Sequence, residues 1–527
     1  MADAAVVAAP AGAPAQGAAA HAEAGAGLGR VAGEMAVSLG GLGIGRGLNF
    51  AVQVVLARGL GPAGFGLYVL ATTVLRLADI LARVGMDSGA IRFVSIRTGD
   101  RRAVREVAAG TLAAVLVTSA VTGLALWLAA PVLSEAVFRV DRQLVAPLRL
   151  FAFFVPAAAG LTVGAALTRG FRRTVYTVLA RDIAQPVVQA AVLAVMLFAG
   201  LGLSGALLSY GVSLAAALAL ALFFLYRLCG GARVPLAAAA GRGREVLGYS
   251  APLLLVGGIH YVITWLDTLL LGLYRGPADV GVYRAAAQLP LMLPVLLAAS
   301  NSIYGPTVSV LLHRGERASA GVLLRTTSRW LAWLSIPAFA VMFVCAADVV
   351  ALFGDEYVAA GAPVLRVLAV AQLFSVLTGG VGQTLTLTGY QRLELVNSLG
   401  MVALNVALCL ALIPRFGAQG AAIASAVSIV GLNGARMAEV WKVFRMSPFD
   451  AGSLVLAAAG AVALGAGWAA HASVDGPVLR VVAAALAVAA CFGAAVAWRG
   501  IGEDDRRVFQ QVREKVKRRN GGVEAGS

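Results

Sequence analysis

Three polar side chains lie on one face of a long apolar segment near the start of the chain. Arg46, Asn49 and Gln53 occur at i, i+3 and i+7 within residues 34–57, a spacing that places side chains on one side of an α-helix. A guanidinium beside two carboxamides can hold phosphate oxygens, because Arg donates several hydrogen bonds from a permanent charge. The three residues are our leading prediction for phosphate binding. Alternatively, Arg46 extends from the segment's end toward lipid headgroups.

A second set of charges follows in residues 64–85. Arg76, Asp79 and Arg83 repeat the same spacing. A carboxylate between two guanidiniums favours a structural ion pair, and substrate binding by Arg76 and Asp79 is the alternative reading. Further polar side chains that could line the same cavity occur in later apolar segments: Asp182, Gln185, Gln189, Arg284, Gln288, Asn433 and Arg436. Of these, Arg284 and Gln288 are predicted substrate contacts.

An acidic face occurs in residues 247–274. His260, Thr264 and Asp267 lie at i, i+4 and i+7, and therefore on one side of a helix. A carboxylate enclosed among apolar residues can take up a proton or a sodium ion, so this face is a candidate for cation coupling. The alternative is a structural hydrogen bond to a neighbouring helix.

Composition indicates the elements that position these residues. Hydrophobic residues make up 60% of the chain and charged residues 13%, far from the proportions of soluble domains. Apolar segments of the length needed to cross a bilayer as helix recur to the end of the chain, and their continuity favours helices over barrel strands. We predict an all-α polytopic membrane protein with about fourteen transmembrane helices. Their cores are expected at 34–57, 64–85, 104–130, 146–168, 178–200, 204–228, 247–274, 282–311, 322–350, 363–388, 394–414, 417–441, 449–470 and 478–498.

The chain also contains an internal repeat. Gly61-Pro62-Ala63-x-x-Gly66-x-Tyr68 returns 215 residues later as Gly276-Pro277-Ala278-x-x-Gly281-x-Tyr283, since 276 − 61 = 215. Phe138 matches Phe353, and Gly202-x-x-Gly205-Ala206 matches Gly417-x-x-Gly420-Ala421, at the same displacement. We therefore predict two parallel six-helix repeats around a central cavity. We interpret the Gly-Pro-Ala motif as a tight outward-facing turn that contacts no substrate.

The predicted organisation follows from these boundaries. A disordered N-terminal tail (1–33) precedes an N-lobe (34–228), an inter-lobe cytoplasmic loop (229–246) and a C-lobe (247–445). Two further helices (446–499) and a basic cytoplasmic tail (500–527) complete the chain. Most Lys and Arg residues fall in alternate loops, so both termini are predicted to be cytoplasmic, in the cytoplasmic membrane. The net charge of +16 is then a topological signal facing anionic membrane lipids, and no nucleic acid is expected as partner.

Several enzyme classes are disfavoured. None of the three lysines is followed by Ser or Thr, which excludes a Walker-type phosphate loop. The four histidines and four cysteines are scattered, so neither a metal site nor a disulfide framework is predicted, and no cofactor is expected. Short predicted outer loops disfavour an enzyme of glycan assembly. We therefore expect no enzyme activity, and transport by binding and conformational change.

Several motifs give the chain a resemblance to a known family. The run Ala57-Arg58-Gly59-Leu60-Gly61-Pro62-Ala63-Gly64-Phe65-Gly66-Leu67-Tyr68 resembles the start of the polysaccharide and oligosaccharide flippases. Leu352-Phe353-Gly354-Asp355-Glu356-Tyr357, Gly389-Tyr390 and Ile413-Pro414-x-x-Gly417-x-x-Gly420 are similar to later parts of that family. The resemblance covers roughly residues 30–500 and places the chain in the multidrug, oligosaccharidyl-lipid and polysaccharide exporter superfamily.

The resemblance implies a flippase that moves polyprenyl-diphosphate-linked oligosaccharide or polysaccharide repeat units by alternating access. The Asp in the seventh segment looks like the family's pattern, in which a proton or sodium gradient drives some members. The implied partners are the lipid-linked oligosaccharide, membrane lipids, a proton or sodium ion, and glycan-assembly proteins. A cation-coupled multidrug antiporter is the main alternative, and a membrane enzyme of glycan assembly is a less favoured one.

Overall fold

The computed structural model describes residues 13–97, 99–171, 173–230 and 234–499. Within these ranges the regular structure is entirely helical, as predicted. The α-helices are α1 (Ala13–Arg83), α2 (Met86–Ser95), α3 (Arg101–Val132), α4 (Val145–Ala152), α5 (Val155–Gly170), α6 (Thr174–Thr177), α7 (Gln185–Phe198), α8 (Gly202–Cys229), α9 (Leu236–Tyr274), α10 (Pro277–Ala287), α11 (Leu293–His313), α12 (Arg317–Val344), α13 (Ala346–Val350), α14 (Val358–Leu377), α15 (Val381–Leu387), α16 (Gln391–Phe444), α17 (Ala451–Ala472) and α18 (Pro477–Arg499). Short π-helical segments (Leu133–Val137, Val178–Ala184) and 3₁₀ segments (Pro290–Met292, Asp355–Tyr357) continue some of them.

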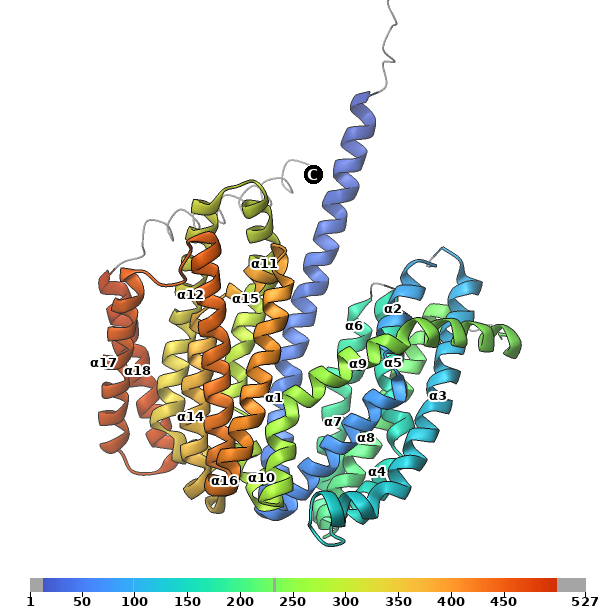
Figure 1. Ribbon diagram of the computed structural model, residues 1–527, viewed down its shortest axis with the longest axis horizontal. Helices are drawn as coiled ribbons and strands as arrows, with labels where there is room; N and C mark the ends of the chain where they lie inside the picture. Colours follow the sequence, from blue (N-terminus) through green and yellow to red (C-terminus); the bar gives the residue numbers. More distant parts are fainter. Residues whose placement is uncertain (1–12, 98, 172, 231–233, 500–527) are drawn as a thin grey trace, which may run out of the picture.

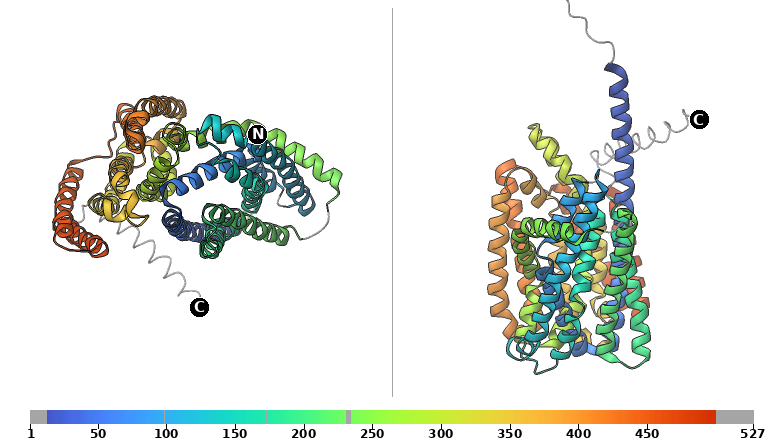
Figure 2. Two further views of the ribbon diagram at one scale, coloured as in Figure 1. Left: turned by 90° about the horizontal axis from the view of Figure 1, so that it is seen from below. Right: turned by 90° about the vertical axis from the view of Figure 1, so that its right-hand side faces the viewer.

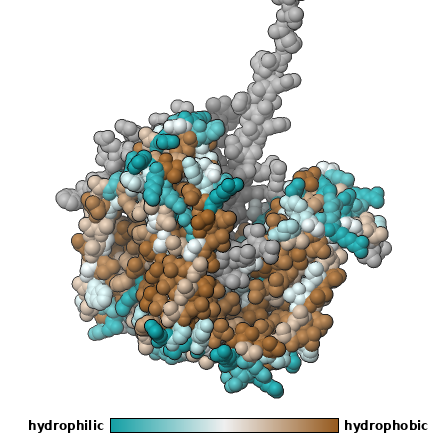
Figure 3. Space-filling view, viewed as in Figure 1, coloured by the Kyte–Doolittle hydropathy of each residue, from teal (hydrophilic) through white to brown (hydrophobic). Residues whose placement is uncertain are grey.

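Ten helical stretches in the described ranges are long and apolar enough to cross a membrane, or eleven if the bent pair α4 and α5 is one span. This number is below the predicted fourteen. Part of the difference has a backbone cause, because α1 and α16 change direction at Gly61 (φ 66°) and Gly417 (φ 55°) and each contains two predicted spans. Figure 3 shows a hydrophobic band between two hydrophilic rims. The protein is therefore a multi-pass membrane protein.

The internal repeat is visible in the backbone. Gly61 and Gly276 both have positive φ, 66° and 87°, and each precedes a helix of its own half. Gly202 and Gly417 form a second pair, with φ of 48° and 55°. Backbone in this region favours glycine, because a Cβ atom is strained there. The matched glycines therefore mark equivalent turns in the two halves.

Helices α2–α8 gather in one group and α10–α16 in another (Figures 1 and 2). The two groups converge at the end of the bundle where α9 meets α10, and we name this end the turn end, because Gly276 precedes α10 there. They diverge toward the opposite end, which we name the arginine end, because Arg97 and Arg242 lie there at the first half of α9. Helices α17 and α18 pack together beside α12, at the edge of the second group (Figure 1).

The repeated motif joins the two groups at the turn end. A Cβ atom on Gly66 would lie 1.7 Å from the carbonyl oxygen of Pro277, and one on Gly281 would lie 2.1 Å from that of Pro62. The two copies therefore dock on each other reciprocally through their glycines. Around this seam Arg58 donates to the carbonyl oxygens of Leu352 (2.8 Å) and Ala351 (3.2 Å), and the Tyr357 hydroxyl donates to that of Ala57 (3.0 Å).

At the arginine end, the first half of α9 (residues 236–250) lies across α3 (Figure 1). Close approach is possible because both helices present glycine: a Cβ on Gly110 would lie 2.1 Å from the Ala239 carbonyl oxygen, and one on Gly243 would lie 2.6 Å from that of Gly110. Residues 236–246, predicted as part of a loop, are thus helical and packed on the N-lobe while still connecting the lobes.

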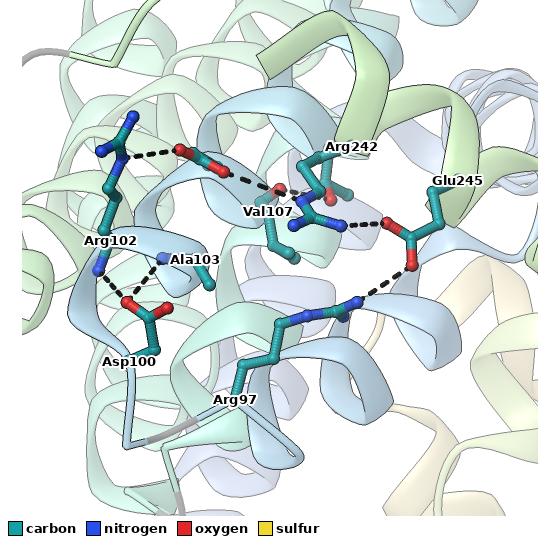
Figure 4. A network of polar contacts seen from close by, with 9 residues as sticks. Arg97, Asp100, Arg102, Ala103, Val107, Arg242 and Glu245 are labelled. Carbon is teal, nitrogen blue, oxygen red and sulfur yellow. Dashed lines mark hydrogen bonds and ion pairs between the residues drawn. The ribbon is translucent and has the colours of Figure 1, made fainter. Parts of the chain in front are cut away.

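Ion pairs accompany this crossing (Figure 4). Glu245 accepts from Arg97 at 3.0 Å and from Arg242 at 2.8 Å, and Arg242 also lies 3.7 Å from Glu106. The hydrogen bond from Arg242 lowers the pKa of Glu245, with a further contribution from Arg97. Asp100 begins α3 by accepting from two backbone amides of its first turn.

The ends of the chain depart from the prediction or lie outside the described residues. Residues 13–33, predicted to form a disordered tail, are the first part of helix α1, in keeping with their high content of Ala, a strong helix former. The predicted basic tail at 500–527 lies outside the described residues.

Candidate functional site

A cavity of about 460 Å³ opens among α9, α10, α14 and α16 in the C-lobe. Its lining combines apolar side chains with hydroxyl, carboxamide, acidic and basic groups. The polar members are Thr264, Trp265, Asp267, Tyr283, Arg284, Gln372, Ser398, Asn405, Ser425 and Ser428. Polar groups of both charges that converge on an apolar chamber are typical of a ligand site.

Asp267 is the acidic centre of this cavity. Its Oδ1 accepts from the backbone amide of Thr268 at 2.6 Å, and its Oδ2 accepts from the Tyr283 hydroxyl and, at 3.4 Å, from the Ser425 hydroxyl. Asn405, from the same helix as Ser425, completes an oxygen-rich side of the cavity. A carboxylate with hydroxyl and carboxamide oxygens suits a proton or a hard monovalent cation.

Arg284 and Arg76 approach one aromatic ring from different lobes. The guanidinium carbon of Arg284 lies 3.9 Å from the ring centroid of Trp265, and that of Arg76, from α1, lies 5.9 Å from it. Both distances fall within the range of cation–π attraction. The ring thus holds two positive charges at the junction of the lobes, where an anionic group could interact with both.

A smaller polar pocket of about 90 Å³ lies in the N-lobe on the other side of Arg76. It is lined by Arg76, Asp79, Thr162, Arg181, Gln185 and Tyr210 among apolar residues. Asp79 is 3.7 Å from Arg83, which pairs more closely with Asp87 at 3.0 Å. The ion pair predicted between Asp79 and Arg83 is therefore present but loose, and Oδ1 of Asp79 is buried with no hydrogen-bond partner among the described residues.

The structure brings some predicted site residues together and separates others. Thr264, Asp267 and Arg284 share the larger cavity, and Arg76 and Asp79 share the smaller one. The predicted face of His260 lies on α9, and the His260 side chain lies outside the part of the structure that is described. Gln288 ends α10, is half-buried, and lines neither cavity.

The first predicted stripe also lies outside both cavities. Arg46, Asn49 and Gln53 are at most half-buried on α1, and none of them lines either cavity. The Asn49 carboxamide donates to the Gly45 carbonyl oxygen of its own helix at 2.8 Å. Their role in phosphate binding stays a prediction.

The other polar positions named from sequence have various partners. Gln189 is buried and donates to the Tyr68 hydroxyl at 2.9 Å, and Asn433 donates to Ser375 at 3.3 Å. Arg436 forms an ion pair with Glu394 across α16. These contacts link helices, as is common for polar residues in membrane proteins.

Sequence reasoning missed most of the polar residues that line the larger cavity: Trp265, Tyr283, Gln372, Ser398, Asn405, Ser425 and Ser428. Tyr283 is the last residue of the repeated motif, which we interpreted as scaffold without a role in binding. Its partner Tyr68 bonds Gln189 in the N-lobe while Tyr283 bonds Asp267 in the C-lobe, so equivalent tyrosines support different chemistry. The repeat was a signal for Tyr283, whereas Asn405 and Ser425 lie more than 130 residues from Asp267 and share no local pattern with it.

Comparison with curated proteins gives two partial relatives. The chain is 28% identical over 173 residues to the "Probable flippase AglR" of Haloferax volcanii, a region covering 32% of this chain and 35% of that protein. It is 27% identical over 174 residues to the "Probable low-salt glycan biosynthesis flippase Agl15" of the same organism, covering 33% and 36%. The chain thus matches about a third of the length of these curated relatives.

Solved structures show the same fold over most of the chain. The lipid II flippase MurJ in an inward closed conformation superposes with a TM-score of 0.65 at 10% identity, covering 85% of this chain and 96% of MurJ. An inward-facing multidrug resistance MATE family transporter of the MOP superfamily superposes with a TM-score of 0.56 at 16% identity, covering 77% and 98%. These identities establish similarity of fold alone.

A family model described as polysaccharide biosynthesis protein matches residues 32–311, which is more than half of the chain. The matched range includes the N-lobe, the inter-lobe connection and the helices that carry Asp267 and Arg284. The family expected from the flippase-like motifs agrees with this match. The chain belongs to the polysaccharide biosynthesis protein family.

Proposed function

We propose that this protein is a flippase that moves polyprenyl-diphosphate-linked oligosaccharide or polysaccharide repeat units across the cytoplasmic membrane by alternating access. The observation that carries the proposal is the pair Arg76 and Arg284, which meet at Trp265 from opposite lobes. The partial relatives are flippases by name, and the family is one of polysaccharide biosynthesis. Both termini then face the cytoplasm, with the arginine end inside.

The two arginines would lower the energetic cost of moving a diphosphate through the bilayer. A charged group at the centre of a bilayer costs roughly 2.5–3.5 kcal/mol on insertion scales, so a diphosphate needs cations along its path. Guanidinium groups bind phosphate oxygens in bidentate fashion. Phosphate oxygens would replace the ring of Trp265 as the partner of both arginines. The hydroxyl and carboxamide groups of the larger cavity would form hydrogen bonds with the sugars.

Asp267 is our proposed coupling group. Its carboxylate lies in the same cavity as Arg284, and Tyr283, which bonds it, belongs to the same helix as Arg284. Binding of a proton or sodium ion at Asp267 would therefore change the electrostatic environment of the residues that hold the phosphate. Such proximity lets a cation gradient bias the conformation in which substrate is released.

The direct test is reconstitution. Purified protein in liposomes containing a fluorescent polyprenyl-diphosphate oligosaccharide should make the inner-leaflet probe accessible to an impermeant quencher, faster than in protein-free liposomes. The same lipid with a neutral headgroup should move much more slowly, because the arginines would have no anion to bind. Equal rates for protein-containing and protein-free liposomes would refute the proposal.

A second candidate function is a cation-coupled multidrug antiporter, favoured by the superposition on MATE transporters. It requires the cavity to accept organic cations. The presence of Arg76 and Arg284 at the lobe junction opposes binding of such cations. Expression in a drug-sensitive strain distinguishes the two, since raised tolerance to cationic drugs without export of glycan would support the antiporter.

A further inference from the structure

Three potential metal ligands converge at the turn end, far from the candidate site. Cys345, Asp348 and His471 each offer a donor atom, and these atoms all lie within 4.8 Å of one another. Cys345 directly precedes α13, Asp348 lies in the first turn of α13, and His471 lies in the last turn of α17. The cluster thus joins the C-lobe to the pair α17 and α18, which lies outside the twelve-helix repeat.

Each donor is largely withdrawn from solvent. Cys345 is fully buried, the Asp348 side chain is 9% exposed and that of His471 is 23% exposed. Nε2 of His471 lies 2.6 Å from Oδ2 of Asp348. The other carboxylate oxygen, Oδ1, faces Nη1 of Arg480 at 4.0 Å, and Arg480 is itself held by the Val474 carbonyl oxygen at 3.1 Å. Because Arg480 faces Oδ1 of Asp348, Oδ2 is directed at the imidazole of His471.

We infer that Cys345, Asp348 and His471 bind a transition-metal dication, with Zn²⁺ as the ion that best fits the donor set. Thiolate, imidazole and carboxylate are the three ligand types that zinc prefers. The thiolate and the carboxylate together supply two negative charges, which neutralise the ion. An ion pair between His471 and Asp348 alone would not require a buried thiol at the same point.

The geometry needs only a small adjustment. Neighbouring ligands of a tetrahedral zinc ion are separated by roughly 3.3–3.6 Å, given metal–ligand bonds of about 2.0–2.3 Å. The contact between His471 and Asp348 must lengthen, and the Cys345 thiol must move toward the metal position. Rotation of the three side chains can provide both changes. Binding replaces the thiol proton, and any proton shared by the imidazole and the carboxylate, with the metal. Water completes the fourth position on the exposed side of His471.

The position gives the metal a structural role. The contact between α17 and α12 is apolar, and at its turn end a Cβ on Gly467 would lie 3.8 Å from Cγ2 of Val344. Apolar contacts between helices gain little within lipid, so a metal bridge would add attachment there. The segment after α13 also accepts the hydrogen bonds from Arg58 of the other lobe. Metal would therefore order the C-lobe next to the seam.

Titration of the purified full-length protein with Co²⁺, after treatment with a chelator, tests this site. We expect one equivalent to bind and to produce a thiolate-to-cobalt charge-transfer band, and Zn²⁺ to displace it. Cys345→Ser and His471→Gln should each abolish the band, whereas Cys409→Ser and His313→Gln should retain it. Zn²⁺ should also raise the melting temperature of the parent protein and leave that of Cys345→Ser unchanged.

Variants that keep the fold protect the test against misfolding. Asp348→Asn retains the shape of the side chain and should weaken Co²⁺ binding about 10-fold or more, and Arg480→Gln should weaken it less, as orienting groups do. Size-exclusion profiles matching the parent would confirm that the variants are folded. Absence of a stoichiometric cobalt band in the parent, or an unchanged band in Cys345→Ser, would overturn the inference and leave an ion pair of His471 with Asp348.

Discussion

Arg76 and Arg284 illustrate how single residues acquire a shared role. They lie 208 positions apart, since 284 − 76 = 208, and both approach the ring of Trp265. Arg46, whose set has the same helical spacing as that of Arg76, lines neither cavity. At the residue scale, the proposed phosphate contact therefore rests on convergence across the lobe junction rather than on one helical face.

Neutralising either arginine should impair transport. We expect Arg76→Gln and Arg284→Gln each to lower the initial flipping rate about 10- to 100-fold, the usual effect of losing a charge-assisted hydrogen bond. Arg142→Gln serves as control, because the Arg142 side chain is 88% exposed and pairs with Glu135 at the turn end. Flipping of the fluorescent diphosphate lipid in liposomes gives the rates. Full activity of both variants would remove these residues from the substrate path.

Asp267 should determine the response to a cation gradient. In Asp267→Asn the charge that binds the ion is lost while the shape stays, so we expect transport to become independent of imposed proton and sodium gradients. Asp475→Asn is a suitable control, since this carboxylate is fully exposed in the turn between α17 and α18. Gradient dependence equal to that of the parent would exclude Asp267 as the coupling group.

Helices of the two lobes meet in two places, and the proposed transport cycle would have to break or bend the contacts there. At the turn end, the start of α10 packs on α1 through backbone contacts that only glycine permits. At the arginine end, the first half of α9 is held on α3 by Gly110, Gly243 and the ion pairs of Glu245. Both contacts join the lobes, and they lie at opposite ends of the molecule (Figure 1).

A methyl group at Gly66 should open the turn end. Because its Cβ would lie 1.7 Å from the Pro277 carbonyl oxygen, Gly66→Ala must separate the two motif copies and shift the protein toward a state open at that end. Spin labels at Arg142 and Asp355, one on each lobe, should report a longer distance by pulsed electron resonance. Gly47→Ala is the control, since its Cβ meets nothing within 4 Å. Identical distance distributions in all three proteins would contradict the seam's role.

Removing the charge of Glu245 should loosen α9 from α3. Two ion pairs, each modest at a surface, are lost in Glu245→Gln, so we expect amide hydrogen exchange of residues 236–246 to accelerate roughly two- to fivefold. Glu135→Gln, which breaks a pair at the opposite end, should leave this segment unchanged.

The same contact predicts a pH dependence. Hydrogen bonding lowers the pKa of Glu245 below its ordinary value of 4.5, so the folded state binds the proton less readily than the unfolded state. The stabilisation is therefore complete above pH 4.5 and is lost as the pH falls through the lowered pKa. After correction for the intrinsic pH dependence of amide exchange, the protection of residues 236–246 should fall on acidification in the parent and much less in Glu245→Gln. Parallel pH profiles in the two proteins would show that this carboxylate does not hold α9.

The whole molecule combines two related halves with one added helix pair. Loops rich in arginine lie at one end of the bundle, and the two motif turns lie at the other (Figure 1). Under the rule that positive loops stay in the cytoplasm, we propose that the turn end faces outward. This assignment also places the proposed metal site on the outer side.

Cysteine labelling tests this orientation. In a background lacking the four native cysteines, a cysteine replacing Asp475 at the turn end should react with an impermeant maleimide on intact cells. A cysteine replacing Arg317 at the arginine end should react only after permeabilisation. Both positions are exposed, so access depends on the side of the membrane. The opposite labelling pattern would invert the proposed topology and the proposed direction of transport.

The amino-acid sequence by itself determined the membrane class, the helical architecture and the duplication. These features depend on local composition and on repeated turns: continuous apolar segments must be helices in lipid, and the paired glycines adopt equivalent positive φ in both halves. Asp267 and Arg284 were also found from sequence, because a charge within an apolar segment is costly and therefore conspicuous.

Only the tertiary structure decided which charges meet. Helical periodicity states which residues share a face, but not toward which neighbour that face turns, so Arg46 and Arg76 were equivalent in sequence and differ in the fold. The joining of Arg76, Trp265 and Arg284, the approach of Ser425 to Asp267, and the cluster of Cys345 with His471 all depend on contacts between segments far apart in the chain. Helix packing sets those contacts, and the sequence pattern of one segment does not specify which other segment packs against it.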